Sequence, residues 1–305
     1  MNIESFLKDL KNQAKQTITY ELSPDKSASL DSLATKVLES KLLNHIDGFV
    51  CTDSPLAKMR QSSLLSSIKF QALFNKPVVC TTSLRDRNSL ALSSMMLGAH
   101  SFDIRLFLAL SGDALKLGDQ PQAKSVFEGS SLKILELINA LNKGFDLGGN
   151  PLKHPLVTPI YAFSTISSYA KNKTLLKKSL ESKIALGTKA IITQPVYDIE
   201  TLKELLEWVD EINAKYSTDA ILIFGFFPVL SLKSAIYLNT KLPGVFVPES
   251  LIVKMEEASL SGSEKEVGFE LSLKLLESLL GLHKKCHFMN GNNANLASSM
   301  LASIK

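Results

Sequence analysis

Residues 190–228 read AIITQPVYDIETLKELLEWVDEINAKYSTDAILIFGFFP, and this stretch decides the fold. Its first residues, 190–193, are apolar and β-branched, which predicts a short buried strand. A helix follows an N-cap at Asp198, and its apolar positions share one face: Leu202, Leu205, Leu206, Val209 and Ile212. Residues 220–227 form a second apolar strand that stops at Pro228. Strand, helix and strand in this order predict an α/β fold with a parallel sheet.

The same alternation extends through the whole chain. The predicted strands cover residues 17–22, 47–51, 77–82, 105–110, 155–163, 190–193, 220–227 and 286–289. About eight such units close a (β/α)₈ TIM barrel in one domain of residues 1–305, because a parallel barrel of this kind needs about 250 residues or more. Ile3, Phe6 and Leu10 mark a short N-terminal helix, and an extended helical excursion to Leu280 separates the last two strands. An open doubly wound sheet is the alternative, but the chain lacks its GxGxxG turn.

Composition excludes several classes of function. The net charge is +4 with no basic block, so we expect neither a nucleic-acid partner nor an anionic membrane surface. No apolar run approaches the about 20 residues that span a bilayer. The cysteines at 51, 80 and 286 are too sparse for a disulfide framework, and the histidines have no metal-ligand spacing. We therefore expect a cytoplasmic protein with no dedicated metal site.

Polar residues gather where the predicted strands end. Glu21 lies at the end of the first strand, Asp113 follows the fourth and Gln194 follows the sixth. In a (β/α)₈ barrel these ends meet at one mouth. Two carboxylates and an amide there suit a heteroaromatic ligand with donors and acceptors, and a carboxyl group can deliver a proton to it.

Seven short segments carry a resemblance to a known family. In chain order they are TYELSP at 19–24, TDSPLAKMR at 52–60, LRDRN at 84–88, LSGD at 110–113, KIALG at 183–187 leading to ITQPVY at 192–197, GFFP at 225–228 and HF at 287–288. Together they resemble the corresponding segments of the methylenetetrahydrofolate reductase family. The matches fall in the right order over nearly the whole chain.

The resemblance implies a flavoenzyme that binds FAD and takes electrons from NADH or NADPH to reduce 5,10-methylenetetrahydrofolate. It makes Glu21 and Asp113 the catalytic residues, with Glu21 as the acid. Asp113 would lie between flavin and pterin, and Gln194 would bind the pterin edge. The implied cofactor-binding residues are Thr52, Thr81, Ser111, Gly112, Asp113, Phe163 and Lys183.

Some positions depart from the family pattern. Thr81 and Ser167 stand where many members carry a His, and Ser111 replaces a frequent Arg. Leu232 and Asn293 fall where some members place a Phe and an Arg, so we expect a ligand wall with no cation and no aromatic ring. Two other functions stay open: a barrel flavin oxidoreductase for a different small molecule, and a non-catalytic flavin- or folate-binding subunit. A homo-oligomer and an electron-donating partner protein also stay open.

Overall fold

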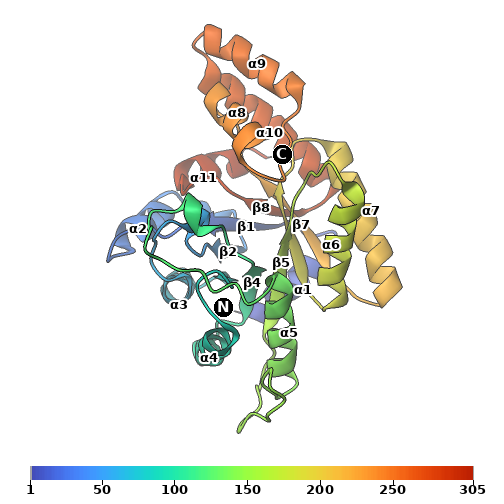
Figure 1. Ribbon diagram of the computed structural model, residues 1–305. Coiled ribbons are helices and arrows are strands. Elements are labelled where there is room, and N and C mark those ends of the chain that lie inside the picture. The colour runs from blue at the N-terminus through green and yellow to red at the C-terminus, as the bar shows by residue number, and fades with distance from the viewer. Residues whose placement is uncertain (1, 305) are drawn as a thin grey trace.

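Eight parallel strands close on one another in chain order, with β1 paired to both β2 and β8 (Figure 1). The computed structural model describes residues 2–304. The strands are β1 (Thr17–Leu22), β2 (Gly48–Cys51), β3 (Val78–Ser83), β4 (Leu106–Leu110), β5 (Tyr161–Ile166), β6 (Ala190–Pro195), β7 (Ile221–Phe226) and β8 (Lys285–Phe288). This closed parallel sheet confirms the predicted (β/α)₈ barrel.

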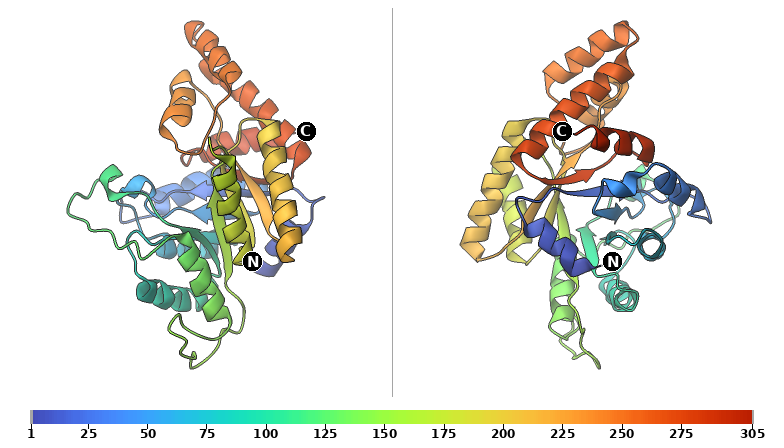
Figure 2. Two further views of the ribbon diagram at one scale, coloured as in Figure 1. Left: turned by 45° about the vertical axis from the view of Figure 1, so that its right-hand side comes forward. Right: turned by 180° about the vertical axis from the view of Figure 1, so that it is seen from behind.

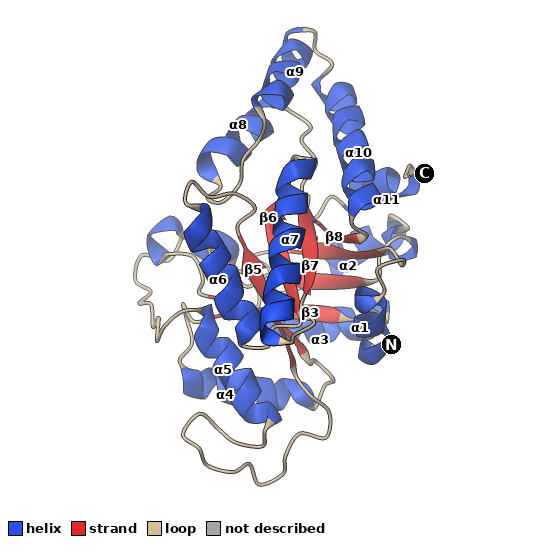
Figure 3. Ribbon diagram, turned by 90° about the vertical axis from the view of Figure 1, so that its right-hand side faces the viewer, coloured by secondary structure: helices blue, strands red, loops and turns tan. Residues whose placement is uncertain are grey.

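Helices surround the barrel, and three of them stand beyond one of its ends (Figures 2 and 3). The helices are α1 (Ile3–Lys11), α2 (Asp31–Glu39), α3 (Ser63–Phe74), α4 (Ser89–His100), α5 (Ser131–Asn142), α6 (Lys173–Ala185), α7 (Ile199–Tyr216), α8 (Leu232–Lys241), α9 (Glu249–Leu260), α10 (Glu264–Leu282) and α11 (Ala294–Ala302). The excursion predicted between the last two strands is α8 to α10. Among residues 2–304, none of these helices combines the length and apolar character needed to cross a membrane.

Helix α7 forms as its sequence pattern predicts. The Asp198 carboxylate accepts the Thr201 N–H at 2.7 Å and caps the first turn. The predicted apolar face is buried against the barrel at Leu202, Leu205 and Val209. Burial of this face, rather than intrinsic helix propensity, supplies most of the stability of such a helix.

The predicted position of β5 was wrong. The strand spans Tyr161–Ile166 instead of residues 155–163, and its pairing with β4 begins at Tyr161. Residues 151–159 contain three prolines, at positions 151, 155 and 159, which cannot donate ladder hydrogen bonds. That segment is a loop. The Asn142 side chain of α5 holds its end, because it donates a hydrogen bond to the Ile160 C=O and accepts one from the Ile160 N–H.

Helix α1 closes the amino end of the barrel. Its Ile3, Phe6 and Leu10 are buried against interior residues of β2 to β7. The ammonium of Lys285 donates to three backbone carbonyls, those of Asp9, Asn12 and Lys15, at 2.6–2.9 Å. Because this end is sealed, a ligand can enter the barrel only from the carboxyl ends of the strands.

Candidate functional site

A cavity of about 880 Å³ lies at the carboxyl ends of the strands. This volume is in the range of small-molecule sites, about 300–1,000 Å³. All but one of the predicted site residues line it: Glu21, Thr52, Thr81, Ser111, Gly112, Asp113, Lys183 and Gln194. The structure therefore brings together residues from β1, β3, β6 and α6 and from the loops after β2 and β4. Among residues 2–304, no cluster of metal-ligating side chains is found.

Phe163 is the exception. Its side chain is 0% exposed and packs in the barrel interior with Leu106 and Ile192. The reason is the shifted position of β5, since Phe163 lies in the middle of the strand and not at its end. Thr165, two residues later on the same inward face, lines the cavity instead.

Glu21 reaches the cavity because side chains alternate along β1. Its neighbours Tyr20 and Leu22 point outward into the core between barrel and helices, so Glu21 points inward. Its carboxyl group has no hydrogen-bond or ion-pair partner among residues 2–304. Burial raises the pKa of the Glu21 carboxyl to about 7. Near neutral pH the group therefore holds a proton that it can give up, which is the property of a general acid.

Gln194 also presents an unpaired polar group. It lines the cavity from β6, and within residues 2–304 its side-chain amide has no hydrogen-bond partner. An amide offers both donors and an acceptor, so it can match the mixed edge of a heteroaromatic ring.

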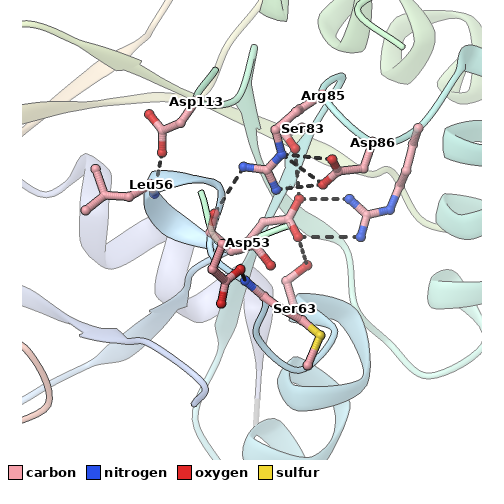
Figure 4. Close-up of polar contacts among 11 residues, drawn as sticks. Asp53, Leu56, Ser63, Ser83, Arg85, Asp86 and Asp113 are labelled. Atoms are coloured by element: carbon pink, nitrogen blue, oxygen red, sulfur yellow. Dashed lines mark hydrogen bonds and ion pairs between the residues drawn. The ribbon is translucent and has the colours of Figure 1, made fainter. Parts of the chain in front are cut away.

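Asp113 is engaged with the loop that follows β2. One of its carboxylate oxygens accepts the Leu56 N–H at 2.6 Å (Figure 4). Leu56 and its neighbours Ser54 and Ala57 all have positive φ, a conformation that is strained for residues with side chains. Gly112 precedes Asp113 with φ of 92°, and a Cβ there would lie 2.7 Å from Cβ of Arg85. Only glycine fits, so the backbone beside Asp113 approaches its neighbours unusually closely.

A network of charged side chains, which the sequence did not predict, supports the loop after β2. Arg87 binds both carboxylate oxygens of Asp53. Asp53 also accepts a hydrogen bond from the Ser83 hydroxyl at 3.0 Å (Figure 4). Arg85 pairs with Asp86 and donates to the Ser54 carbonyl. Both arginines belong to the LRDRN segment, which is the signal that could have revealed this network.

Two groups of the cavity wall lack the partners that buried polar groups normally have. The hydroxyl of Thr81 is buried and has no hydrogen-bond partner within the described residues 2–304. Lys183 donates to the Thr165 carbonyl at 2.5 Å and has no acidic partner among residues 2–304. Burial lowers the pKa of Lys183 to about 8. A ligand with a polar ring and an anionic group would satisfy both residues.

Leu232 and Asn293, which we expected to form one wall of the ligand site, do not line the cavity. Leu232 packs against the apolar cluster beneath α8, and its N–H donates to Glu264. Asn293 caps α11 and borders a separate groove. The cavity wall is formed instead by α8, which contributes Lys233 and Tyr237. The expectation of a wall with no cation and no aromatic ring was therefore wrong. Of the other three departures from the family pattern, Thr81 and Ser111 line the cavity, whereas Ser167 lies against Gly244.

The fold and the cavity define a (β/α)₈-barrel protein with a ligand-sized site at the carboxyl ends of its strands. The family model for methylenetetrahydrofolate reductase matches residues 6–305, and the chain belongs to that family. The resemblance predicted from the sequence is thereby confirmed.

One solved structure is similar over almost the full length of both proteins. It is an uncharacterized protein from Clostridium thermocellum that binds two copies of 5-methyl-5,6,7,8-tetrahydrofolic acid. The TM-score is 0.63 at 15% sequence identity, with 97% of this chain and 98% of that chain covered. At this identity the likeness shows the fold alone. No curated protein matches the chain.

Proposed function

We propose that the protein is an FAD-dependent reductase that converts 5,10-methylenetetrahydrofolate to 5-methyltetrahydrofolate with NADH or NADPH as the electron donor. The observation that carries this proposal is Glu21, an unpaired carboxyl group with a raised pKa in the cavity of a chain that belongs to this family. The reaction consumes one hydride, which comes from the nicotinamide, and one proton.

The residues present fit a flavin. The partnerless Thr81 hydroxyl and the close backbone at Gly112 suit a flat polar ring, and Lys183 suits a phosphate group. Thr52 and Ser111 would complete this wall, since both line the cavity. When bound, the flavin would accept hydride from the nicotinamide and pass it to the folate.

The chain's own residues would handle the proton and the developing charge. The five-membered ring of the substrate must open before hydride can arrive, and opening requires a proton on the departing nitrogen. Glu21 would donate that proton. Asp113 would stabilise the cation that opening creates, and Gln194 would hold the pterin edge. Asp113 accepts the Leu56 N–H with one carboxylate oxygen, which would leave its other oxygen for the ligand.

The decisive experiment is anaerobic addition of 5-methyltetrahydrofolate to the purified protein loaded with FAD. We expect the flavin absorbance to bleach, because the reverse reaction transfers hydride to the flavin. A flavin that NADH bleaches and methyltetrahydrofolate does not would indicate an oxidoreductase for another small molecule.

A folate-binding protein without redox activity is the second candidate. The structural relative from Clostridium thermocellum favours it, since that protein is described as binding methyltetrahydrofolate. A protein that binds methyltetrahydrofolate and takes up no FAD would support this candidate over the reductase.

A further inference from the structure

Helices α3 and α4 lie side by side on the outside of the barrel (Figure 1). Ile68 of α3 is partly buried and packs against the apolar cluster that contains Leu92 and Met96 of α4. The Gln71 side chain of α3 also donates a hydrogen bond to the Asp103 C=O, just beyond α4, at 3.0 Å. The two helices therefore present one continuous outer surface.

This outer surface combines large apolar residues with small ones. We call it the α3–α4 face, and it consists of Leu65, Ala72, Leu73, Leu90, Ala91, Ser94, Gly98 and Phe102. The four large side chains are 46–74% exposed. Leu65 and Ala72 are seven residues apart, as are Ala91 and Gly98, and this spacing returns to the same side of a helix. Single exposed apolar side chains are common in monomers, but a contiguous patch marks an interaction surface.

The α3–α4 face carries no charged residue. Helix α4 contains no Asp, Glu, Lys or Arg, and α3 contains only Lys69, which pairs with Asp31 of α2 at 2.7 Å. The outer surface of α6 and α7 is different, because ion pairs such as Lys173 with Glu204 cross it. A surface helix normally carries charged residues on its outer side, and a helix that is apolar on all sides is normally buried. The α3–α4 face is therefore suited to contact with another apolar surface.

The apolar area of the face is close to what a dimer needs. A standard protein interface removes about 800 Å² from each partner, of which roughly 450 Å² is apolar. The exposed fractions of the four large side chains correspond to about 350 Å², at roughly 120 Å² for a leucine and 200 Å² for a phenylalanine. The two alanines of the face and the partly buried Ile68 and Leu97 add to this area.

The lack of charge favours a second copy of the chain as the partner. In a two-fold symmetric dimer the same patch lies on both sides of the interface, so charged residues would meet others of their own kind. An uncharged face avoids this repulsion and is complementary to itself. A membrane is a poorer partner, because helices that bind lipid surfaces carry Lys or Arg beside their apolar side, and Lys69 is engaged by Asp31.

We infer that the α3–α4 face is the contact surface of a homodimer, in which α3 and α4 of one copy pack on α3 and α4 of a second copy across a two-fold axis. The small side chains of Ala91 and Ser94, together with Gly98, let the helices approach closely. None of the eight residues lines the cavity, so the inference does not depend on the proposed function.

Sedimentation velocity of the full chain tests this inference. We expect the wild type to sediment at twice the mass of one chain and to dissociate on dilution. Leu90→Arg places a charge in the face of both copies and should weaken the dimer at least about a hundredfold, because like charges at an interface repel. Leu260→Arg is the matched control and should leave the dimer unchanged, since Leu260 of α9 is 91% exposed and lies outside the face. Circular dichroism shows whether each variant is folded.

A milder substitution supplies a second measurement. Ser94→Cys adds a thiol to the face, and the native thiols of Cys51, Cys80 and Cys286 are buried. A maleimide should label the new thiol several-fold more slowly at concentrations where the dimer forms than at concentrations where it dissociates. Ser259→Cys, at an exposed position of α9, should be labelled at the same rate in both.

Three results would overturn the inference. The first is a wild-type chain that stays monomeric at its highest soluble concentration. The second is a dimer that Leu90→Arg does not weaken and in which the thiol of Ser94→Cys is never shielded, because the interface would then lie elsewhere. The third is a monomer that cosediments with phospholipid vesicles and loses this binding through Leu90→Arg, because the face would then belong to a membrane contact.

Discussion

At the scale of single residues, Glu21 combines two properties that rarely occur together in a carboxyl group. It is buried enough for its pKa to rise to about 7, yet it has no partner within residues 2–304. A structural carboxylate would be paired, because an unpaired buried charge is costly. Perturbed, unpaired groups in cavities are candidates for function.

The first prediction separates the two half-reactions. Glu21→Gln keeps the size of the side chain and removes its acidic proton. Folate reduction should fall about 10²–10⁴-fold, the usual contribution of general acid catalysis. Flavin reduction by NADH or NADPH should survive, because it opens no ring. In the wild type, folate reduction should decline above pH 7, since Glu21 loses its proton as the pH rises through its pKa of about 7. Stopped-flow kinetics measures both steps, and equal loss in both would show that Glu21 is structural.

The second prediction concerns the effect of the Glu21 carboxyl on the free energy of unfolding. The folded protein holds the Glu21 proton up to pH about 7, whereas the unfolded chain loses it near the ordinary value of 4.5. The folded state therefore binds more protons between these values, and Glu21 lowers the free energy of unfolding as the pH rises from 4.5 to 7. Glu21→Gln removes this effect and should stabilise the protein by about 1–3 kcal/mol at pH 8, with little change at pH 4.

Urea unfolding at the two pH values measures this difference. Glu256→Gln is the matched control, because Glu256 is an exposed residue of α9 away from the cavity. A Glu21→Gln variant that is stabilised equally at pH 4 and pH 8 would contradict the raised pKa.

At the scale of elements, hydrogen bonds and an ion pair join the loops after β1, β2 and β4. The loop after β4 supplies Asp113 to the Leu56 N–H and Asp119 to the Met59 N–H, at 2.6 and 2.8 Å. These bonds hold the strained residues of the loop after β2. Lys26 from the loop after β1 also pairs with Asp119. Three loops that are distant in sequence are thus tied together by carboxylates.

The third prediction concerns this tie. The hydrogen bond from Met59 lowers the pKa of Asp119 to about 2, so the carboxylate keeps its bond at neutral pH and loses it only as the pH falls toward 2. Asp119→Ala should speed amide hydrogen exchange across residues 54–61 without changing exchange in the barrel strands, because local opening needs only these loop contacts. Asp25→Ala, at an exposed position in the loop after β1, is the control. Unchanged exchange at Met59 would show that Asp119 does not hold the loop.

The elements also show which parts of the protein its sequence predicts. Helix α7 and strand β7 follow from periodicity, since their burial is a local pattern. Strand β5 was misplaced because the apolar run at residues 155–163 was given more weight than the two prolines within it. The α8 wall was missed for a different reason. Lys233 and Tyr237 show the i, i+4 spacing of a shared face, but which face meets the cavity depends on packing against Val229 and Met255.

Most long-range polar contacts could likewise not be predicted from the sequence. Glu21, Asp113 and Gln194 could be placed at one mouth because strand order alone puts them there. The contact of Asp113 with Leu56 joins loops 57 residues apart, and no local pattern encodes it. The catalytic and binding roles of these residues remain predictions.

At the scale of the whole molecule, the two ends of the barrel have different tasks. The carboxyl end carries the cavity, while the amino end is sealed by α1 and by Lys285. In (β/α)₈ barrels the amino face is associated with stability and the carboxyl face with function. Lys285 is only 1% exposed, and besides three carbonyls its ammonium reaches the Thr17 hydroxyl at 3.0 Å. A sequence that shows lysine beside an apolar strand gives no sign of this role.

The last prediction tests whether the two ends are energetically separate. Lys285→Met keeps the length of the side chain but leaves the Asp9, Asn12 and Lys15 carbonyls without their donor. We expect a loss of about 2–4 kcal/mol in the free energy of unfolding, because an abandoned acceptor that stays buried costs about 1–3 kcal/mol and the more exposed of these carbonyls will recover water. Lys284→Met, at the exposed neighbouring position, should cost almost nothing. The affinity of folded Lys285→Met protein for methyltetrahydrofolate should equal that of the wild type, since nothing at the cavity changes. Urea unfolding and calorimetry measure the two quantities, and a variant that loses affinity while staying fully folded would show that the seal at the amino end also shapes the cavity.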